Sequence, residues 1–186
     1  MANRNTQGFG LIPAGTLGST PATSGQGKYK IDANYATTIY HGGAVASDAG
    51  YIIEGQGTDT PILGVLNGIF YNAATTLKPT FANHYVQVTP ANSEDIDAFV
   101  FDNPQQQYVV ATDDAVAQAG YLETYDMNVS AGSTTTGMSS ATLDIADTSA
   151  DAASWRLLRS AEDPENDENA AFRSVVVVAN LIELQS

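Results

Sequence analysis

The sequence predicts an all-β protein, a single compact β-barrel or β-sandwich domain with an extended N-terminal arm. About ten short runs rich in β-branched and aromatic residues follow one another along the chain. Connections rich in glycine, asparagine and proline separate these runs, as is typical of sandwiches and barrels. Helical patterns are few, and the best candidate, residues 113–120, would form only about two turns. The 186 residues are enough for one domain with a sizeable core.

The N-terminal segment differs from the rest of the chain. Its first 30 residues contain none of the 21 acidic side chains, and they hold six glycines and two prolines that break any helix or strand period. A segment of this kind can become ordered by lying along another surface. We therefore expect residues 1–27 to be an extended arm that attaches to a partner, and residues 28–186 to form the β domain. The expected partner-binding residues are Arg4, Phe9, Leu11, Ile12 and Leu17.

Within the β domain, periodicity and turn chemistry locate the elements. Ser47–Gly50 is a hairpin turn signal, and the sequence Asp-Asn-Pro at 102–104 is a second turn. Four consecutive valines at 175–178 predict a central strand covered on both faces. Residues 131–153 are small and polar, and we expect a long loop region that holds one short strand. In chain order the expected strands are 28–33, 36–40, 43–47, 50–54, 62–72, 84–90, 95–102, 107–112, 121–130, 141–146, 154–160 and 172–185.

Composition restricts the possible partners. The chain has seven basic side chains, a net charge of −14 and a sequence pI near 4.1. Such a charge disfavours nucleic acid and anionic membranes, so we expect neither as a partner. No run approaches the ~20 apolar residues of a membrane span, and the start lacks the pattern of a secretory signal. The chain has no cysteine, which excludes disulfides and thiolate metal sites and fits synthesis in a cytoplasm.

The motifs that could carry chemistry are incomplete. His41-Gly42-Gly43 matches the oxyanion loop of some esterases, but no Gly-x-Ser-x-Gly nucleophile motif accompanies it. Asp163, Glu165 and Asp167 have the alternate spacing of a calcium loop, but Pro164 interrupts them and no glycine follows. The acidic residues 162–168 are therefore interpreted as a solvated loop tip. We expect no enzyme activity, no cofactor, and no catalytic or metal-binding residues.

Several stretches resemble small virion structural proteins of tailed bacteriophages, particularly those of marine hosts. The Phe-Gly-Leu-Ile-Pro sequence at 9–13 matches the usual opening of these proteins, and the likeness covers most of the chain except residues 131–153. The shared motifs are apolar or shape the backbone, and none of them is catalytic. The stretches that carry the resemblance are 1–4, 8–15, 40–45, 50–52, 62–68 and 172–180.

The resemblance implies a capsid decoration, or cement, protein. Such a protein would be made in the host cytoplasm and then bind the outer face of the virion capsid, where it stabilises the shell by bridging major capsid subunits. The resemblance also implies a homo-oligomer, with a trimer favoured. The alternative hypothesis is a carbohydrate- or host-surface-binding β module of a phage head or tail fibre. That module would need exposed aromatic or acidic contacts, for which Tyr121, Tyr125 and Trp155 are the candidates.

Overall fold

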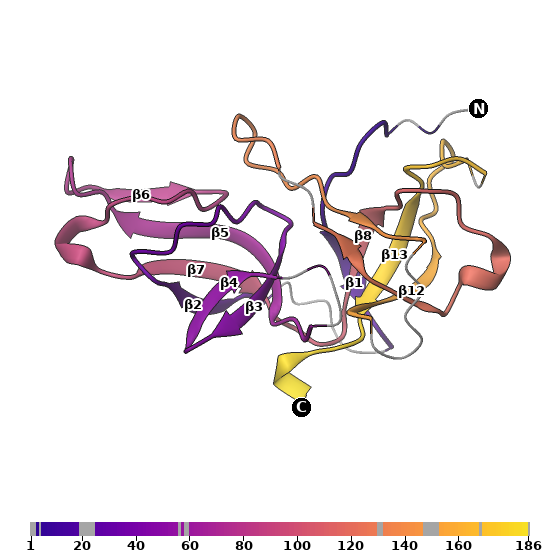
Figure 1. Cartoon of the computed structure of the whole chain (residues 1–186), viewed down its shortest axis with the longest axis horizontal. Coiled ribbons are helices and arrows are strands. Elements are labelled where there is room, and N and C mark those ends of the chain that lie inside the picture. Colours follow the sequence, from indigo (N-terminus) through magenta and orange to yellow (C-terminus); the bar gives the residue numbers. More distant parts are fainter. Residues whose placement is uncertain are drawn as a thin grey trace.

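The computed structural model describes residues 3, 5–18, 25–55, 57, 60–129, 132–146, 153–167 and 169–185. Within this part of the chain, strands pair antiparallel in three sheets, and the helical content is limited to three short 3-10 turns. The expected all-β class is therefore confirmed, although none of the described sheets closes into a barrel. The strands form two lobes that lie side by side (Figure 1).

The first lobe is a six-stranded sheet in which the order β2-β7-β5-β3-β4 is completed by β6 on β5. The nine-residue strand β5 is long enough to pair with β7 along one edge and with β3 and then β6 along the other. Ala49 and Gly50 both have left-handed φ angles, 50° and 89°, which confirms the expected hairpin turn between β3 and β4. The strands are β2 (Gly27–Ile31), β3 (Ala44–Asp48), β4 (Tyr51–Glu54), β5 (Gly64–Asn72), β6 (Pro79–Ala82) and β7 (Ile96–Phe101).

The second lobe is a five-stranded sheet in the order β1-β8-β13-β12-β9, beside the short pair of β10 with β11. Strand β13 lies between two neighbours, and its four valines are all buried, so the expected central strand is confirmed. The strands are β1 (Ile12–Thr16), β8 (Gln106–Ala111), β9 (Thr124–Tyr125), β10 (Met127–Asn128), β11 (Thr142–Leu143), β12 (Trp155–Ser160) and β13 (Ser174–Ala179). The 3-10 turns are η1 (Ala91–Ser93), η2 (Gln118–Gly120) and η3 (Glu183–Gln185).

Two hydrophobic clusters form the core. The cluster of the second lobe is centred on Trp155, whose ring meets that of Tyr108 edge to face with centroids 5.7 Å apart. This cluster also takes in Leu11, Ala44 and Val65, so it reaches from the second sheet to the first. A separate cluster of isoleucine, leucine, valine and Tyr85 side chains fills the first lobe. The lobes are therefore joined by apolar packing as well as by the β7–β8 connection.

Some predicted elements are absent from the described structure. Residues 84–90 form only isolated bridges at Tyr85 and Pro90, and their burial does not alternate, since Tyr85 is buried in the core whereas Val86 is 40% exposed. The helix expected at 113–120 is reduced to the turn η2. The strand expected at 121–130 is broken at Asp126, whose buried carboxylate accepts the backbone N–H of Ser154 at 3.2 Å. Strands β1 and β6 are present where none was expected.

Candidate attachment surface

The N-terminal segment, which we expect to bind a partner, is attached to the second lobe at its beginning. The Asn3 side-chain amide donates hydrogen bonds to the carbonyl oxygens of Ala171, at 2.8 Å, and Ala170, at 3.2 Å. Its Oδ1 accepts the backbone N–H of Asp167. Asn3 is only 7% exposed. It fixes the start of the segment to the loop between β12 and β13.

Two glycines let the segment pass through a narrow space in the fold. A Cβ atom on Gly8 would lie 2.0 Å from the carbonyl oxygen of Ser140, and one on Gly10 would lie 2.8 Å from that of Gly42. Gly10 also has a φ of 73°, which L-residues rarely adopt. The next residue, Leu11, donates its N–H to Gly42 at 2.8 Å. These glycines therefore serve close backbone packing, whereas the sequence suggested an arm without structure of its own.

After this passage, the segment forms the edge strand β1. Ile12 pairs with Val109 and Thr16 with Gln106, with a register shift between Pro13 and Gly15. Proline has no N–H to donate to a neighbouring strand, and it is tolerated in an edge strand because one side of that strand has no neighbour. Among the described residues, no strand pairs with the other side of β1. Within the described ranges, β1 is thus an edge strand of the second sheet.

The structure separates the predicted partner-binding residues by their exposure. Ile12 is 45% exposed, whereas Leu11 is 1% exposed and belongs to the core. Phe9 and Leu17 are partly buried, and Arg4 lies outside the described residues. Residues 5–17 lie on the chain's own body, which differs from the expected arm that leaves it. Of the predicted residues that are described, Ile12 presents the most surface to a partner.

Other apolar side chains are exposed beyond this segment. Five of the seven large ones lie in stretches without acidic residues, namely 1–30, 60–93 and 127–143. The stretch 60–93 contains β5 and β6, and its lack of acidic residues is a signal in the sequence that points to it, although none of its residues was predicted to bind a partner. The exposed large apolar side chains are Ile12, Leu77, Phe81, Val86, Leu122, Val129 and Leu184.

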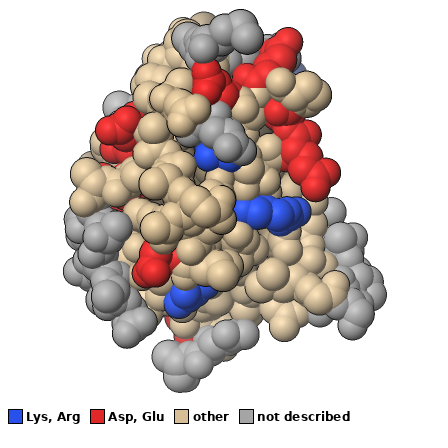
Figure 2. Space-filling model, turned by 90° about the vertical axis from the view of Figure 1, so that its right-hand side faces the viewer, with Lys and Arg blue, Asp and Glu red and all other residues tan. Residues whose placement is uncertain are grey.

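The end of the second lobe has a contrasting surface. It includes the loop between β12 and β13, where Glu162, Asp163 and Glu165 are exposed. In the view onto this end, acidic side chains gather along the upper border, and basic side chains are few (Figure 2). The acidic surface and the exposed apolar hairpin β5–β6 therefore lie on different lobes.

A row of side chains crosses four strands on the outer face of the first lobe. Lys30 pairs with Asp97, Asp97 with Phe70, and Phe70 with Phe81, from β2 through β7 and β5 to β6. The two phenylalanine rings lie with centroids 4.7 Å apart, and Phe81 is 73% exposed. One end of the row is therefore ionic and the other is apolar.

Asp97 is held by two lysines of the neighbouring strand. Its carboxylate oxygens lie 2.7 Å from Lys28 Nζ and 2.6 Å from Lys30 Nζ. Burial alone would raise the pKa of Asp97, but the hydrogen bonds and positive charges of the two lysines outweigh burial and lower it. The carboxylate is therefore kept ionised, and the two lysines are occupied in holding it.

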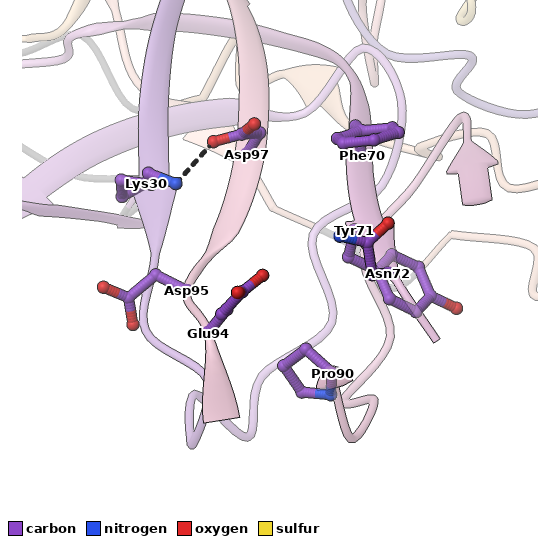
Figure 3. A pocket seen from close by; sticks show the side chains of 8 residues that line it. All are labelled: Lys30, Phe70, Tyr71, Asn72, Pro90, Glu94, Asp95 and Asp97. Carbon is purple, nitrogen blue, oxygen red and sulfur yellow. Dashed lines mark ion pairs between the residues drawn. The ribbon is translucent and has the colours of Figure 1, made fainter. Parts of the chain in front are cut away.

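A pocket of about 250 Å³ lies beside this ion pair, between the beginning of β7 and the end of β5. Figure 3 shows that the ammonium group of Lys30 and the carboxylate of Asp97 are turned toward each other. Since that ion pair engages the basic group of the pocket, the lining offers an anion little. The pocket is lined by Lys30, Phe70, Tyr71, Asn72, Pro90, Glu94, Asp95 and Asp97.

The two histidines have structural surroundings. His41 Nδ1 lies 2.8 Å from the backbone oxygen of Asn67, and the ring of His84 stacks on Tyr40 with centroids 6.0 Å apart. Within the described ranges, no group of three or more histidine, cysteine or acidic side chains could hold a metal ion. The described part of the chain also has no helix that is long and apolar enough to cross a membrane.

The aromatic residues proposed for a carbohydrate-binding module do not form an exposed surface. Trp155 is 1% exposed and Tyr125 is 2% exposed, and both belong to the core of the second lobe. The ring of Tyr121 packs against that core and lies 5.6 Å from the guanidinium carbon of the buried Arg173. These side chains stabilise the fold and leave no row of rings for a sugar to stack on.

Comparison of the chain with protein-family models, with curated proteins and with solved structures gives no match.

Proposed function

We propose that the protein is a virion structural protein that decorates the outer face of a phage capsid and bridges neighbouring major capsid subunits. The observation that carries this proposal is the position of β1 at the edge of its sheet among the described strands. There, a segment without acidic residues presents Ile12, 45% exposed, beside backbone that no described strand covers. The resemblance of the sequence to phage virion proteins supports the same role.

An open strand edge is a general means of attachment. A strand of the capsid protein would add to β1 through backbone hydrogen bonds, and Ile12 would fill a pocket between its side chains. If the capsid protein presents that strand only in the assembled shell, binding would stabilise the shell by mass action. The acidic surface of the second lobe would keep neighbouring copies soluble and apart.

Binding to particles tests the role directly. The particles are those of the phage that encodes the chain, stripped of the protein and mixed with the full-length wild type or a variant. Ile12→Asp should lower the affinity for particles, measured by co-sedimentation, by about 30-fold or more, because it places a charge at a desolvated contact. The control Val129→Asp changes another exposed apolar residue, 38% exposed, and should bind within about twofold of the wild type.

Two results would contradict the proposal. If purified particles contain no copies of the chain, it is not a virion protein. If they contain only a handful of copies, the protein belongs to a tail or fibre and does not decorate the shell. Point variants are used because deletion of residues 1–27 would also remove the core residue Leu11 and the strand β1.

A further inference from the structure

The hairpin of β5 and β6 ends in an exposed apolar edge at the outer end of the first lobe. In Figure 1 the turn of this hairpin lies at the end of that lobe away from the second lobe, and β6 runs along the upper border of the lobe. Phe81 is 73% exposed, Leu77 is 72% exposed and Val86, just beyond β6, is 40% exposed. No described strand pairs with the outer side of β6. The hairpin thus combines an open edge with apolar side chains.

The hydrogen bonds of the hairpin show which backbone groups face outward. At the turn, the N–H of Ala73 donates to the carbonyl of Lys78 at 3.2 Å. Along the register Asn72–Pro79 and Phe70–Phe81, bonded and non-bonded pairs alternate, so Phe81 directs its N–H and C=O away from β5. Pro79 likewise directs its C=O outward, and it has no N–H to leave unpaired. These outward groups of Phe81 and Pro79 could bond to another strand, and the next residue along, Asn83, already donates its side-chain amide to the carbonyl of Thr136 at 2.8 Å.

The turn residue Leu77 adds a second feature. Its φ is 53°, a left-handed conformation in which a leucine is strained relative to glycine. Since its side chain is 72% exposed, it contributes little packing within the monomer. A leucine here gains buried contacts only when another surface covers the hairpin.

Charge restricts what that surface can be. Two copies of a chain with net charge −14 repel each other, and this repulsion is smallest where the facing surfaces carry the fewest carboxylates. Residues 60–93, which include the whole hairpin, contain no acidic side chain, and Lys78 is the basic one. The hairpin is therefore a place where two such acidic copies can meet without opposing carboxylates.

We propose that the occupant of this edge is a second copy of this chain, paired antiparallel β6 to β6 about a two-fold axis at Phe81. The N–H and C=O of Phe81 would then bond to Phe81 of the second copy, and the C=O of Pro79 would face the N–H of Asn83 of the second copy. The Lys78 backbones would lie about 20 Å apart, at opposite ends of the pair. Since this separation exceeds the Debye length of about 10 Å at 0.1 M salt, the positive charges of the two lysines are largely screened from each other.

Such pairing joins the sheets of two first lobes and closes after two copies, because the contact is the same on both. It differs from the trimer that the sequence resemblance implies. It uses β6 and leaves β1 free, so it stands or falls independently of the proposed function.

Sedimentation equilibrium of the full-length chain at low and high salt tests the pairing. We expect a species of twice the 19.5 kDa chain mass, and tighter association at high salt because salt screens the repulsion between copies. Phe81→Asp should weaken association by about 100-fold. The matched control Leu122→Asp changes another exposed large apolar side chain, 63% exposed and on the second lobe, and should change association by less than about twofold.

Two further variants separate the ring from the backbone and keep the test valid if Phe81→Asp misfolds. Phe81→Ala keeps the outward N–H, whereas Phe81→Pro removes it, so the proline variant should associate more weakly. Because the chain has no cysteine, Phe81→Cys should form a disulfide-linked dimer under oxidising conditions, and Leu122→Cys should not. A monomer at both salt concentrations, a trimer, association that weakens with salt, or equal effects at Phe81 and Leu122 would each overturn the proposal.

Discussion

Asn166 bonds to both backbone groups of Ser174, with its Nδ2 donating to the carbonyl at 2.8 Å and its Oδ1 accepting the N–H at 2.9 Å. The same amide donates to the hydroxyl oxygen of Ser160 at 3.0 Å. These bonds join the end of β12 to the start of β13. The acidic loop is therefore held in place by a neutral side chain within it, while exposed carboxylates surround that side chain.

Replacement of this amide should destabilise the protein. Asn166→Ala removes partners from partly buried backbone groups, so the free energy of unfolding should fall by about 1–3 kcal/mol. The nearby exposed Glu162→Gln should change it by less than about 0.5 kcal/mol. Urea unfolding monitored by circular dichroism measures both values. Equal effects of the two variants would show that the loop does not depend on Asn166.

The ion pairs of Asp97 should make the free energy of unfolding depend on pH in the acidic range. The pKa of Asp97 is lowered in the folded state, so its contribution is complete above the unfolded value of about 3.9 and is lost as pH falls through the folded value. Asp97→Asn should lower the free energy of unfolding by about 1 kcal/mol near pH 7, since the lysine partners are about half exposed.

The difference between wild type and Asp97→Asn should shrink below about pH 4, and also at high salt. Urea unfolding from pH 2.5 to 7 measures it, with the exposed Glu94→Gln as the control. A difference that stays constant down to pH 2.5 would mean that Asp97 acts through packing and not through its charge.

Leu11 and Ile12 are neighbours with different surroundings, and their variants should report whether the N-terminal segment stays on the body in solution. Leu11→Ala should reduce the free energy of unfolding by about 2–4 kcal/mol, because Leu11 lies in the core between the sheets. Ile12→Ala should cost less than about 1 kcal/mol, because Ile12 is 45% exposed. Chemical denaturation measures both. Small effects at both positions would instead indicate a segment that detaches, as expected for a free arm.

The elements that the sequence predicted correctly are those specified by local patterns. The valines at 175–178 are apolar without interruption, and they form a central strand because neighbouring strands cover both edges. The turn at 49–50 was recognisable because its left-handed positions suit small residues and glycine. Such patterns need no knowledge of distant parts of the chain.

The N-terminal segment and β6 could not be predicted in this way. Glycine content suggests flexibility, and only the position of Ser140 next to Gly8 reveals that a glycine is needed for close packing. Strand β6 is four residues long and begins with a proline, and its large apolar residue, Phe81, is exposed and does not pack in the core. Its sequence pattern is therefore that of a loop. Ile12 was included among the candidate contacts, but its exposure beside the buried Leu11 depends on pairing with β8, which the sequence does not encode locally.

The Tyr29 phenol donates a hydrogen bond, 2.6 Å long, to Asp102 Oδ2. This bond should make the free energy of unfolding depend on pH in the alkaline range. Burial first, and then the hydrogen bond and negative charge of Asp102, raise the pKa of Tyr29 to about 12, above the unfolded value of about 10. A raised pKa means that the contribution is complete below pH 10 and is lost as pH rises toward 12. Tyr29→Phe should reduce the free energy of unfolding by about 0.5–1.5 kcal/mol at pH 7, since solvent weakens this partly exposed hydrogen bond. That reduction should become smaller between pH 10 and 11.5, measured by urea unfolding of both proteins, since other tyrosines affect both alike. Asp102→Asn should lower the pKa of Tyr29, so that the absorbance of its phenolate appears at a lower pH than in the wild type. A reduction that is the same at pH 8 and pH 11.5 would show that the hydroxyl of Tyr29 does not carry this dependence.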